Sequence, residues 1–500
     1  RTSELERALA AVAVLAILAG ALLRLWNLGA WSLWGDEVAS LNLAAAPVSV
    51  ILARATDLYP PLYSLFLHFW QGLGSSEAVV RIPSALAGIA TVGCVAWVAL
   101  QLDIPHRRTI ALSAAALLAL SPLHLWYSRE ARMYAPAALF ATAAAACYLG
   151  ILKRGDLEHE GAKAAKNTKR AALYAPAYII LMLLGMYTAY ANVLLWLAGL
   201  IAAPVLARAL YAAPALPRRY WLAQAVVALG FTPYLPVVAA QVSYGNFGFL
   251  AERIGLATGS TSAAGSLGAA VVLALLAAVA ALALIAFAAS HHLSSRSQQP
   301  WQSRASQIFN LQSSIVLIFA LLTVLGAIPR GLSIKRQLLV FWPLALLAVA
   351  VLLTPRPPLL GTGANRRFAQ PVPRRGGDGG EVPPRAHLVT AGLLVIPLAL
   401  SLALCAVMLA GGPFEDWRGA AAYVTSTAPH AAVYLQSAWS RDAFAHYYRG
   451  DGPLYAPPAA RGGRPGTWAT HPPDVPPASK AGAVLVVNAH PSLGHEVDPL

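Results

Sequence analysis

Long apolar segments alternate with short polar connections along most of the chain. A helix that crosses a bilayer needs about 20 apolar residues, and by this measure the sequence predicts eleven spans. They lie near residues 8–26, 81–101, 109–127, 134–152, 172–189, 191–210, 220–240, 263–289, 308–328, 337–354 and 387–410. The predicted fold is therefore a polytopic α-helical membrane domain over residues 1–410, with about 11 transmembrane helices.

One apolar stretch, Pro60–Gly74, is too short to cross. Its two leading prolines are typical of a helix start, so we expect a helix that lies in the membrane interface. It falls within the first long connection, residues 27–80.

The last part of the chain has a different pattern. Ala432–Leu435 and Ala483–Val487 read as short strands, and Asp416–Ser426 reads as a helix. Residues 411–500 are therefore predicted to form a small soluble α/β domain.

Composition agrees with a membrane protein. Of 500 residues, 58% are hydrophobic and 11% charged, and the mean hydropathy is +0.59. The net charge of +15 comes mostly from short connections between apolar segments, which disfavours nucleic-acid binding and indicates membrane topology. The three cysteines, Cys94, Cys147 and Cys405, lie inside apolar segments without CxxC spacing, so they indicate neither disulfides nor a zinc site.

Orientation follows from the Lys and Arg distribution. With the amino end inside, the inner segments carry 21 of these residues, whereas the short outer loops and their edges, leaving out residues 411–500, carry 9. This asymmetry favours an outside location for residues 27–80 and 411–500.

Two adjacent carboxylates, Asp36 and Glu37, follow the first span directly, with Trp31 and Trp34 beside them. Tryptophan suits the lipid–water boundary, and a charge close to hydrocarbon is costly and usually functional. The alternative is a solvated loop that happens to hold two acids.

Two basic clusters are predicted on the same side. One holds Arg129, Glu130, Arg132 and Tyr134 at the edge of the fourth span, and the other holds Arg330, Lys335 and Arg336. Arginine forks suit phosphate oxygens, although each side chain could simply extend from a helix end to the interface. Together with the acids they suggest an outward cavity for a sugar hydroxyl and a phosphate.

The order of several motifs resembles a known family. Trp-x-Asp-Glu at 34–37 is followed by Tyr-Pro-Pro-Leu-Tyr at 59–63, Ser-Glu-Ala-x-x-Arg-Ile-Pro-Ser at 76–84 and Arg-Glu-Ala-Arg-Met-Tyr at 129–134. This order is similar to the GT-C polyprenyl-phosphate-sugar glycosyltransferases. Within them it is most similar to the bacterial branch related to dolichyl-phosphate-mannose protein mannosyltransferases and lipid A aminoarabinose transferases. The resemblance covers residues 8–200 and is looser at 186–190, 335–343 and 416–418.

The resemblance implies an inverting hexosyl or pentosyl transferase of the bacterial inner (plasma) membrane, with its site facing the periplasm or cell exterior. A sugar would pass from a polyprenyl-phosphate donor to a hydroxyl of a lipid, glycan or protein. Asp36 would be the base, and Glu37 would bind or orient acceptor, donor or metal. The implied donor-phosphate ligands are Arg81, Arg129, Arg132, Lys335 and Arg336.

Supporting roles are implied for Glu130 and Tyr134, and for a pocket wall of Tyr59, Pro60, Pro61 and Tyr63, which could equally be interfacial anchors. A divalent metal beside Glu37, held by His68 or His124, stays open because the spacing has no metal signature.

Two other classes of protein fit the hydropathy. A lipid-linked sugar flippase or exporter without transferase activity should have charged or broken helices near the midplane. A scaffold membrane protein has no need for acids and arginines on one face.

Overall fold

The computed structural model describes residues 2–53, 59–102, 106–153, 161–211, 216–243, 339, 342–353, 384–410, 415–435, 438–456 and 484–487. The predicted spans near 263–289 and 308–328 lie outside these ranges, as do Arg330, Lys335 and Arg336. The structure therefore bears on nine of the eleven predicted spans.

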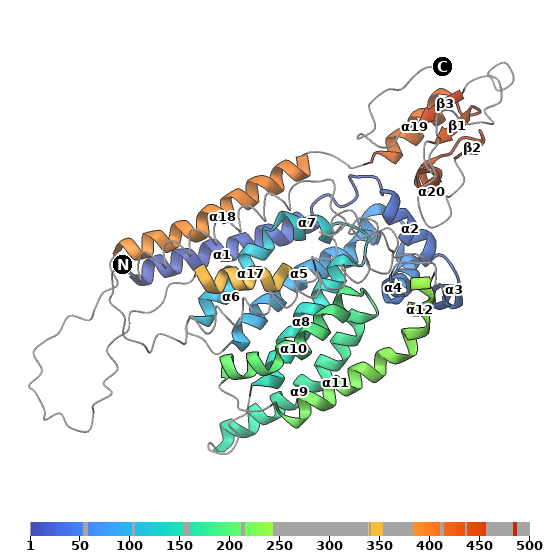
Figure 1. The fold of residues 1–500 in the computed structure, drawn as a ribbon. Helices are drawn as coiled ribbons and strands as arrows, with labels where there is room; N and C mark the ends of the chain where they lie inside the picture. The colour runs from blue at the N-terminus through green and yellow to red at the C-terminus, as the bar shows by residue number, and fades with distance from the viewer. Residues whose placement is uncertain are drawn as a thin grey trace, which may run out of the picture.

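A bundle of long helices fills most of the described part (Figure 1). Its members are α1 (Thr2–Leu25), α5 (Glu77–Gln101), α6 (Arg107–Ala119), α7 (Pro122–Ser128), α8 (Tyr134–Leu152), α9 (Gly161–Met186), α10 (Ala191–Tyr211), α11 (Arg218–Phe231), α12 (Leu235–Ser243), α17 (Trp342–Leu353) and α18 (Pro384–Ala410). Within the described ranges, four helices are long and apolar enough to cross a membrane, or five if the bent pair α6 and α7 counts as one span.

The centre of the bundle is α8, which packs against α5 and α9. Its inward positions are small, including Ala137, Ala138, Ala141 and Ala144, all buried. Small side chains let neighbouring backbones approach closely, which is how helices associate in lipid.

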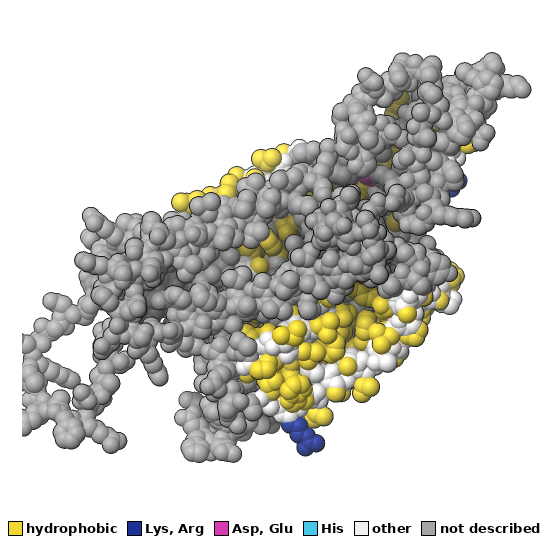
Figure 2. Space-filling view, viewed as in Figure 1, with side chains coloured by type: hydrophobic (Ala, Val, Ile, Leu, Met, Phe, Trp, Pro, Cys, Tyr) yellow, Lys and Arg dark blue, Asp and Glu magenta, His cyan; other side chains and the backbone are white. Residues whose placement is uncertain are grey.

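The outer faces carry large apolar side chains. Leu15, Leu18 and Leu22 of α1 are exposed, and so are Leu222 and Leu229 of α11. Figure 2 shows hydrophobic side chains gathered over the helices on its lower right, around α11 and α12. Such faces suit lipid, and together with the apolar helices they make the chain a membrane protein.

The predicted span 109–127 is bent. α6 ends at Ala119, and α7 starts at Pro122 at an angle of 62°. Proline lacks a backbone N–H, and the Ser121 hydroxyl accepts from the His124 backbone N–H as an N-cap, so the chain begins a new helix here.

Two arginines cap helix ends inside the bundle. Arg24, 0% exposed near the end of α1, donates to the carbonyls of Leu118 (3.3 Å) and Ala119 (2.7 Å), where α6 ends. Arg129, which follows α7, donates to the carbonyls of Leu23 and Trp26, both at 2.6 Å, where α1 ends. Carbonyls at helix ends that have no intrahelical partner thus accept hydrogen bonds from arginine side chains inside the bundle.

The connection between α1 and α5 is more helical than expected. It contains α2 (Gly35–Ala44), α3 (Val48–Ala53), α4 (Leu62–Trp70) and the 3-10 turn η1 (Gln71–Leu73). The short helix predicted at Pro60–Gly74 is confirmed as α4 with η1. The acidic pair lies in α2, a helix that the sequence did not predict.

The C-terminal unit consists of α19 (Trp417–Thr427), β1 (Ala432–Leu435), α20 (Ala438–Tyr447), β2 (Leu454–Tyr455) and β3 (Val484–Val487). Its strands form a parallel sheet in the order β2-β1-β3. The strands predicted at 432–435 and 483–487 and the helix at 416–426 are confirmed. The unit lies at the end of the bundle that carries α2, and α20 contacts α2 (Figure 1).

Candidate active site

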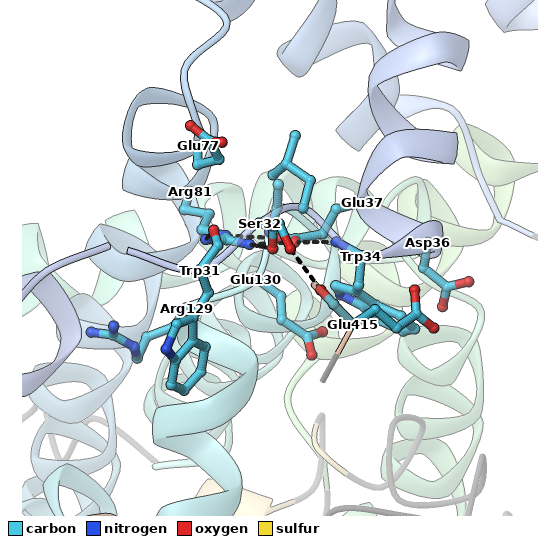
Figure 3. Close-up of polar contacts among 12 residues, drawn as sticks. Trp31, Ser32, Trp34, Asp36, Glu37, Glu77, Arg81, Arg129, Glu130 and Glu415 are labelled. Carbon is cyan, nitrogen blue, oxygen red and sulfur yellow. Dashed lines mark hydrogen bonds and ion pairs between the residues drawn. The ribbon is translucent and has the colours of Figure 1, made fainter. Parts of the chain in front are cut away.

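Asp36 and Glu37 occupy the first turn of α2, where negative charge is favourable. Successive residues of an α-helix point about 100° apart, so the two carboxylates face different surroundings. Glu37 is 0% exposed, whereas the Asp36 side chain is 37% exposed. Figure 3 shows the Asp36 carboxylate standing apart from Glu37. Of the pair, Asp36 is the one that a substrate can reach.

Glu37 is held by four N–H donors. Arg81 binds it through both ends of its fork, with Nε 2.8 Å from Oε1 and Nη2 2.6 Å from Oε2 (Figure 3). The backbone N–H groups of Ala131 and Trp34 donate to Oε1 (2.7 Å) and Oε2 (3.2 Å). Glu37 therefore connects α2, α5 and the turn before α8. A buried carboxylate needs an opposite charge and hydrogen-bond donors, and these contacts supply both.

Arg81 is fully occupied as well. Besides Glu37, it donates from Nη1 to the carbonyls of Leu28 (2.8 Å) and Trp31 (2.9 Å), and from Nη2 to the carbonyl of Ser32 (2.9 Å). An arginine has five N–H donors, and here each has an acceptor. The arrangement in the structure fits an Arg81 that holds the backbone ahead of Asp36 rather than one that faces a phosphate.

Arg129 also binds the backbone. In addition to Leu23 and Trp26, it reaches the carbonyl of Asn27 at 3.4 Å, and its guanidinium lies 5.7 Å from the Trp31 ring centroid. Burial, with the nearby charge of Arg81, lowers the pKa of Arg129 to about 10. Figure 3 shows it on the opposite side of the cluster from Asp36.

Among the residues that the structure describes, Arg132 is the cation that lies beside Asp36. Its Nη2 lies 3.9 Å from Asp36 Oδ2, and its Nη1 donates to the Asp36 carbonyl (3.0 Å) and to Ser40 Oγ (2.7 Å). Burial opposes its charge, but Tyr134, Asp36 and Tyr59 outweigh burial and raise the pKa of Arg132 well above its usual value. Arg132 therefore carries a permanent positive charge next to the accessible carboxylate.

Aromatic rings surround this guanidinium. Its carbon lies 5.3 Å from the Tyr59 centroid and 5.6 Å from the Tyr134 centroid, and the two hydroxyls are 3.3 Å apart. Burial raises the pKa of Tyr59 well above its usual value, so its hydroxyl keeps its proton and can be a hydrogen-bond donor. Pro60 and Pro61, just before α4, and Tyr63 in its first turn are also buried.

A recess opens beside the acidic pair. Its lining consists of Trp31, Ser32, Trp34, Glu37, Arg81, Trp126, Arg129, Glu130 and Met408. Trp126 Nε1 donates to Glu130 Oε1 at 2.6 Å. Asp36 is not part of the lining, so the recess adjoins the Asp36–Arg132 pair and does not contain it.

The proposed metal ligands do not converge. His68 Nδ1 contacts the Ala44 carbonyl at 2.6 Å, and His124 Nδ1 lies 2.9 Å from Arg24 Nη2. Both oxygens of Glu37 face N–H donors, as described above. Within the described ranges, no three His, Cys, Asp or Glu side chains are grouped as a metal site requires.

Two residues at the site escaped the sequence analysis. Ser40 stands one turn after Asp36, and the i,i+4 spacing would have signalled it had α2 been recognised as a helix. Glu415, whose carboxylate accepts from the Gly35 backbone N–H at 3.1 Å, comes from the far end of the sequence and has no local signal.

No family model and no curated protein matches the sequence. Solved structures resemble the fold at low identity. An oligosaccharyltransferase from Archaeoglobus fulgidus in complex with Zn and sulfate has a TM-score of 0.47 and 17% identity, over 90% of this chain and 62% of that chain. The same archaeal oligosaccharyltransferase, AglB, in complex with an inhibitory peptide and a dolichol-phosphate, has a TM-score of 0.46 and 14% identity, over 87% of this chain and 63% of that chain.

ArnT from Cupriavidus metallidurans in the apo state has a TM-score of 0.45 and 14% identity, over 90% of this chain and 86% of that chain. The chain thus spans about three fifths of the archaeal oligosaccharyltransferase and most of ArnT. The chain is similar to both proteins, and the function proposed for it rests on its own site residues.

Proposed function

We propose that this protein is an inverting glycosyltransferase that uses a polyprenyl-phosphate sugar as donor and an acceptor hydroxyl at the outer face of a bacterial inner membrane. The observation that carries the proposal is the pairing of the accessible Asp36 carboxylate with the permanent charge of Arg132, 3.9 Å away. The outward location is supported by the Lys and Arg asymmetry of the sequence.

The chemistry needs only a base and a cation. The acceptor oxygen attacks the anomeric carbon as the bond from that carbon to the phosphate oxygen breaks, and its proton passes to Asp36. The polyprenyl phosphate leaves with the bonding electron pair, and Arg132 stabilises the charge that develops on it. A single displacement inverts the anomeric centre. No step is assigned to a metal, because the described donors do not form a site for one.

Glu37 and Arg81 have a positioning role in this scheme. Their bidentate pair fixes the start of α2 against α5, so that Asp36 meets the substrate in one orientation. Lys335 and Arg336, outside the described residues, remain proposed phosphate ligands together with Arg132. Arg81 and Arg129 would join them only by giving up backbone carbonyls.

The test is to incubate the purified protein with labelled polyprenyl-phosphate sugars and to identify the extracted products. We expect the label on a new acceptor, with the anomeric configuration opposite to that of the donor. Retained configuration would contradict the single displacement. Intact donor that merely changes leaflet would instead favour a flippase, which breaks no bond to the sugar.

Arg132→Ala is expected to raise the donor KM by about 10–100-fold, because a hydrogen bond to a charged group contributes about 1.5–3 kcal/mol. Arg132→Lys keeps the charge but loses the fork, so its effect should be smaller. The exposed Arg441 of α20 provides a control, since Arg441→Ala should leave the donor KM unchanged. Equal effects of Arg132→Ala and Arg441→Ala would count against a phosphate site at Arg132.

A further inference from the structure

The backbone that leads into Asp36 has no regular structure of its own. We call residues 28–35 the approach segment; it begins in the turn that follows α1 and ends at the first residue of α2. On one side, Arg81 binds the carbonyls of Leu28, Trp31 and Ser32. The other side of the approach segment faces the C-terminal unit.

Glu415 makes two contacts with the approach segment on that other side. Its backbone carbonyl accepts from Ser32 Oγ at 2.6 Å, and its Oε2 accepts from the Gly35 backbone N–H at 3.1 Å. The same oxygen accepts from Trp417 Nε1 at 2.6 Å, which ties the carboxylate to the start of α19. Glu415 is buried, and it lies at the positive end of α2, where a carboxylate is favourable.

Tyr447 of α20 makes a second connection. Its hydroxyl accepts from the Leu33 backbone N–H at 2.7 Å and donates to Glu77 Oε1 at 3.0 Å. Burial raises the pKa of Tyr447 to about 12, so the hydroxyl keeps its proton and can do both. Glu77 also accepts from Arg418 Nη2 at 2.8 Å.

We propose that Glu415 and Tyr447 are positioning residues for the reaction at Asp36. Glu415 and Tyr447 connect the C-terminal unit to one side of the approach segment, and Arg81 binds the other side. The approach segment in turn fixes the position of Asp36, the next residue. Neither residue touches the reacting atoms; each acts through the backbone. Misplacement of a catalytic group by about 1 Å can cost on the order of 100-fold in rate. The inference rests on the proposed function and names the part of the chain on which its rate depends.

Adjacent tyrosines allow a matched test. Tyr447→Phe keeps the ring but removes the hydroxyl that serves Leu33 and Glu77. Tyr448→Phe removes a hydroxyl that donates to the Pro429 carbonyl at 3.0 Å, within the C-terminal unit. We expect kcat to fall by about tenfold in Tyr447→Phe with the donor KM nearly unchanged, the loss that one hydrogen bond would produce. Tyr448→Phe should keep the native kcat.

Amide hydrogen exchange gives a readout that does not depend on activity. The Leu33 amide should exchange about tenfold faster in Tyr447→Phe than in the native protein or in Tyr448→Phe. Glu415→Gln keeps an acceptor oxygen for the Gly35 and Trp417 N–H groups, so this variant should retain most of the native kcat. Glu415→Ala removes the acceptor, so its kcat should fall well below that of Glu415→Gln.

Native kcat in Tyr447→Phe, or equal losses in the two tyrosine variants, would overturn the positioning role while leaving the proposed function in place. Unchanged exchange at Leu33 in Tyr447→Phe would also overturn it. Absence of sugar transfer by the native chain would overturn the proposed function itself, so the two failures are distinguishable.

Discussion

Asp36→Asn is expected to lower the rate of sugar transfer by about 10²–10⁴-fold, the usual loss when a general base is removed. Asparagine has nearly the same size as aspartate, and the hydrogen bond from Arg132 to the backbone carbonyl of residue 36 does not depend on the side chain, but asparagine cannot take the proton of the acceptor hydroxyl. Donor binding should therefore change much less than the chemical step. Single-turnover kinetics with saturating donor measures that step directly.

Asp416→Asn is the matched control for this substitution. Asp416 is the N-cap of α19 and accepts from the Gly419 backbone N–H at 3.0 Å, so it also places an acid at a helix start. Asparagine caps a helix as well as aspartate does, and Asp416→Asn should transfer sugar at the native rate. A folded Asp36→Asn protein with nearly native transfer would show that Asp36 is not the base, and Glu37 would be tested next.

Arg81→Ala should give the largest loss of stability among the charged residues of the site. It leaves the carboxylate of Glu37 buried, with two backbone donors and no counter-charge. Removing one partner of a buried ion pair typically costs about 3–5 kcal/mol. Thermal unfolding of the detergent-solubilised protein should show a clearly lower Tm.

Arg418→Ala serves as its comparison. Arg418 and Glu77 form an ion pair of the same kind at 2.8 Å, but the Arg418 side chain is 43% exposed. Exposed pairs contribute about 0–1 kcal/mol, so the Tm should fall much less. In an Arg81→Ala background, Glu37→Gln should recover part of the loss because it removes the unpaired charge. Equal losses from the two arginine variants would mean that the Glu37 pair is not the critical contact.

Features that depend on local sequence were predicted well. The helices at 134–152 and 191–210 follow from apolar length alone, and the strand at 432–435 follows from a short β-branched and aromatic run. The bend between α6 and α7 had a local signal in Ser121 and Pro122, but the apolar pattern continues across it. Hydropathy measures length and does not register a change of direction.

The site was predicted only as a neighbourhood. Position after the first span singled out Asp36 and Glu37, but nothing local distinguishes an exposed carboxylate from a buried one. That difference comes from Arg81 and from the backbone N–H of Ala131, which lies 94 positions after Glu37. The phosphate-binding cations were predicted from their residue type and side of the membrane. In the structure, Arg81 and Arg129 donate hydrogen bonds to backbone carbonyls. Only tertiary contacts could separate them from Arg132.

The contacts that Arg24 makes with the end of α6 and with His124 of α7 have a consequence for biosynthesis. Arg24 lies in the last turn of α1, within the first apolar span, and a buried charge without hydrogen-bond partners is costly. One of its acceptors, the Gly20 carbonyl, is in α1, but the others belong to Leu118, Ala119 and His124. At roughly 5–20 residues per second, the ribosome takes about 5–20 s to reach them. During that interval the nascent first helix carries a cation whose distant partners do not yet exist, so its final burial has to wait for α6 and α7.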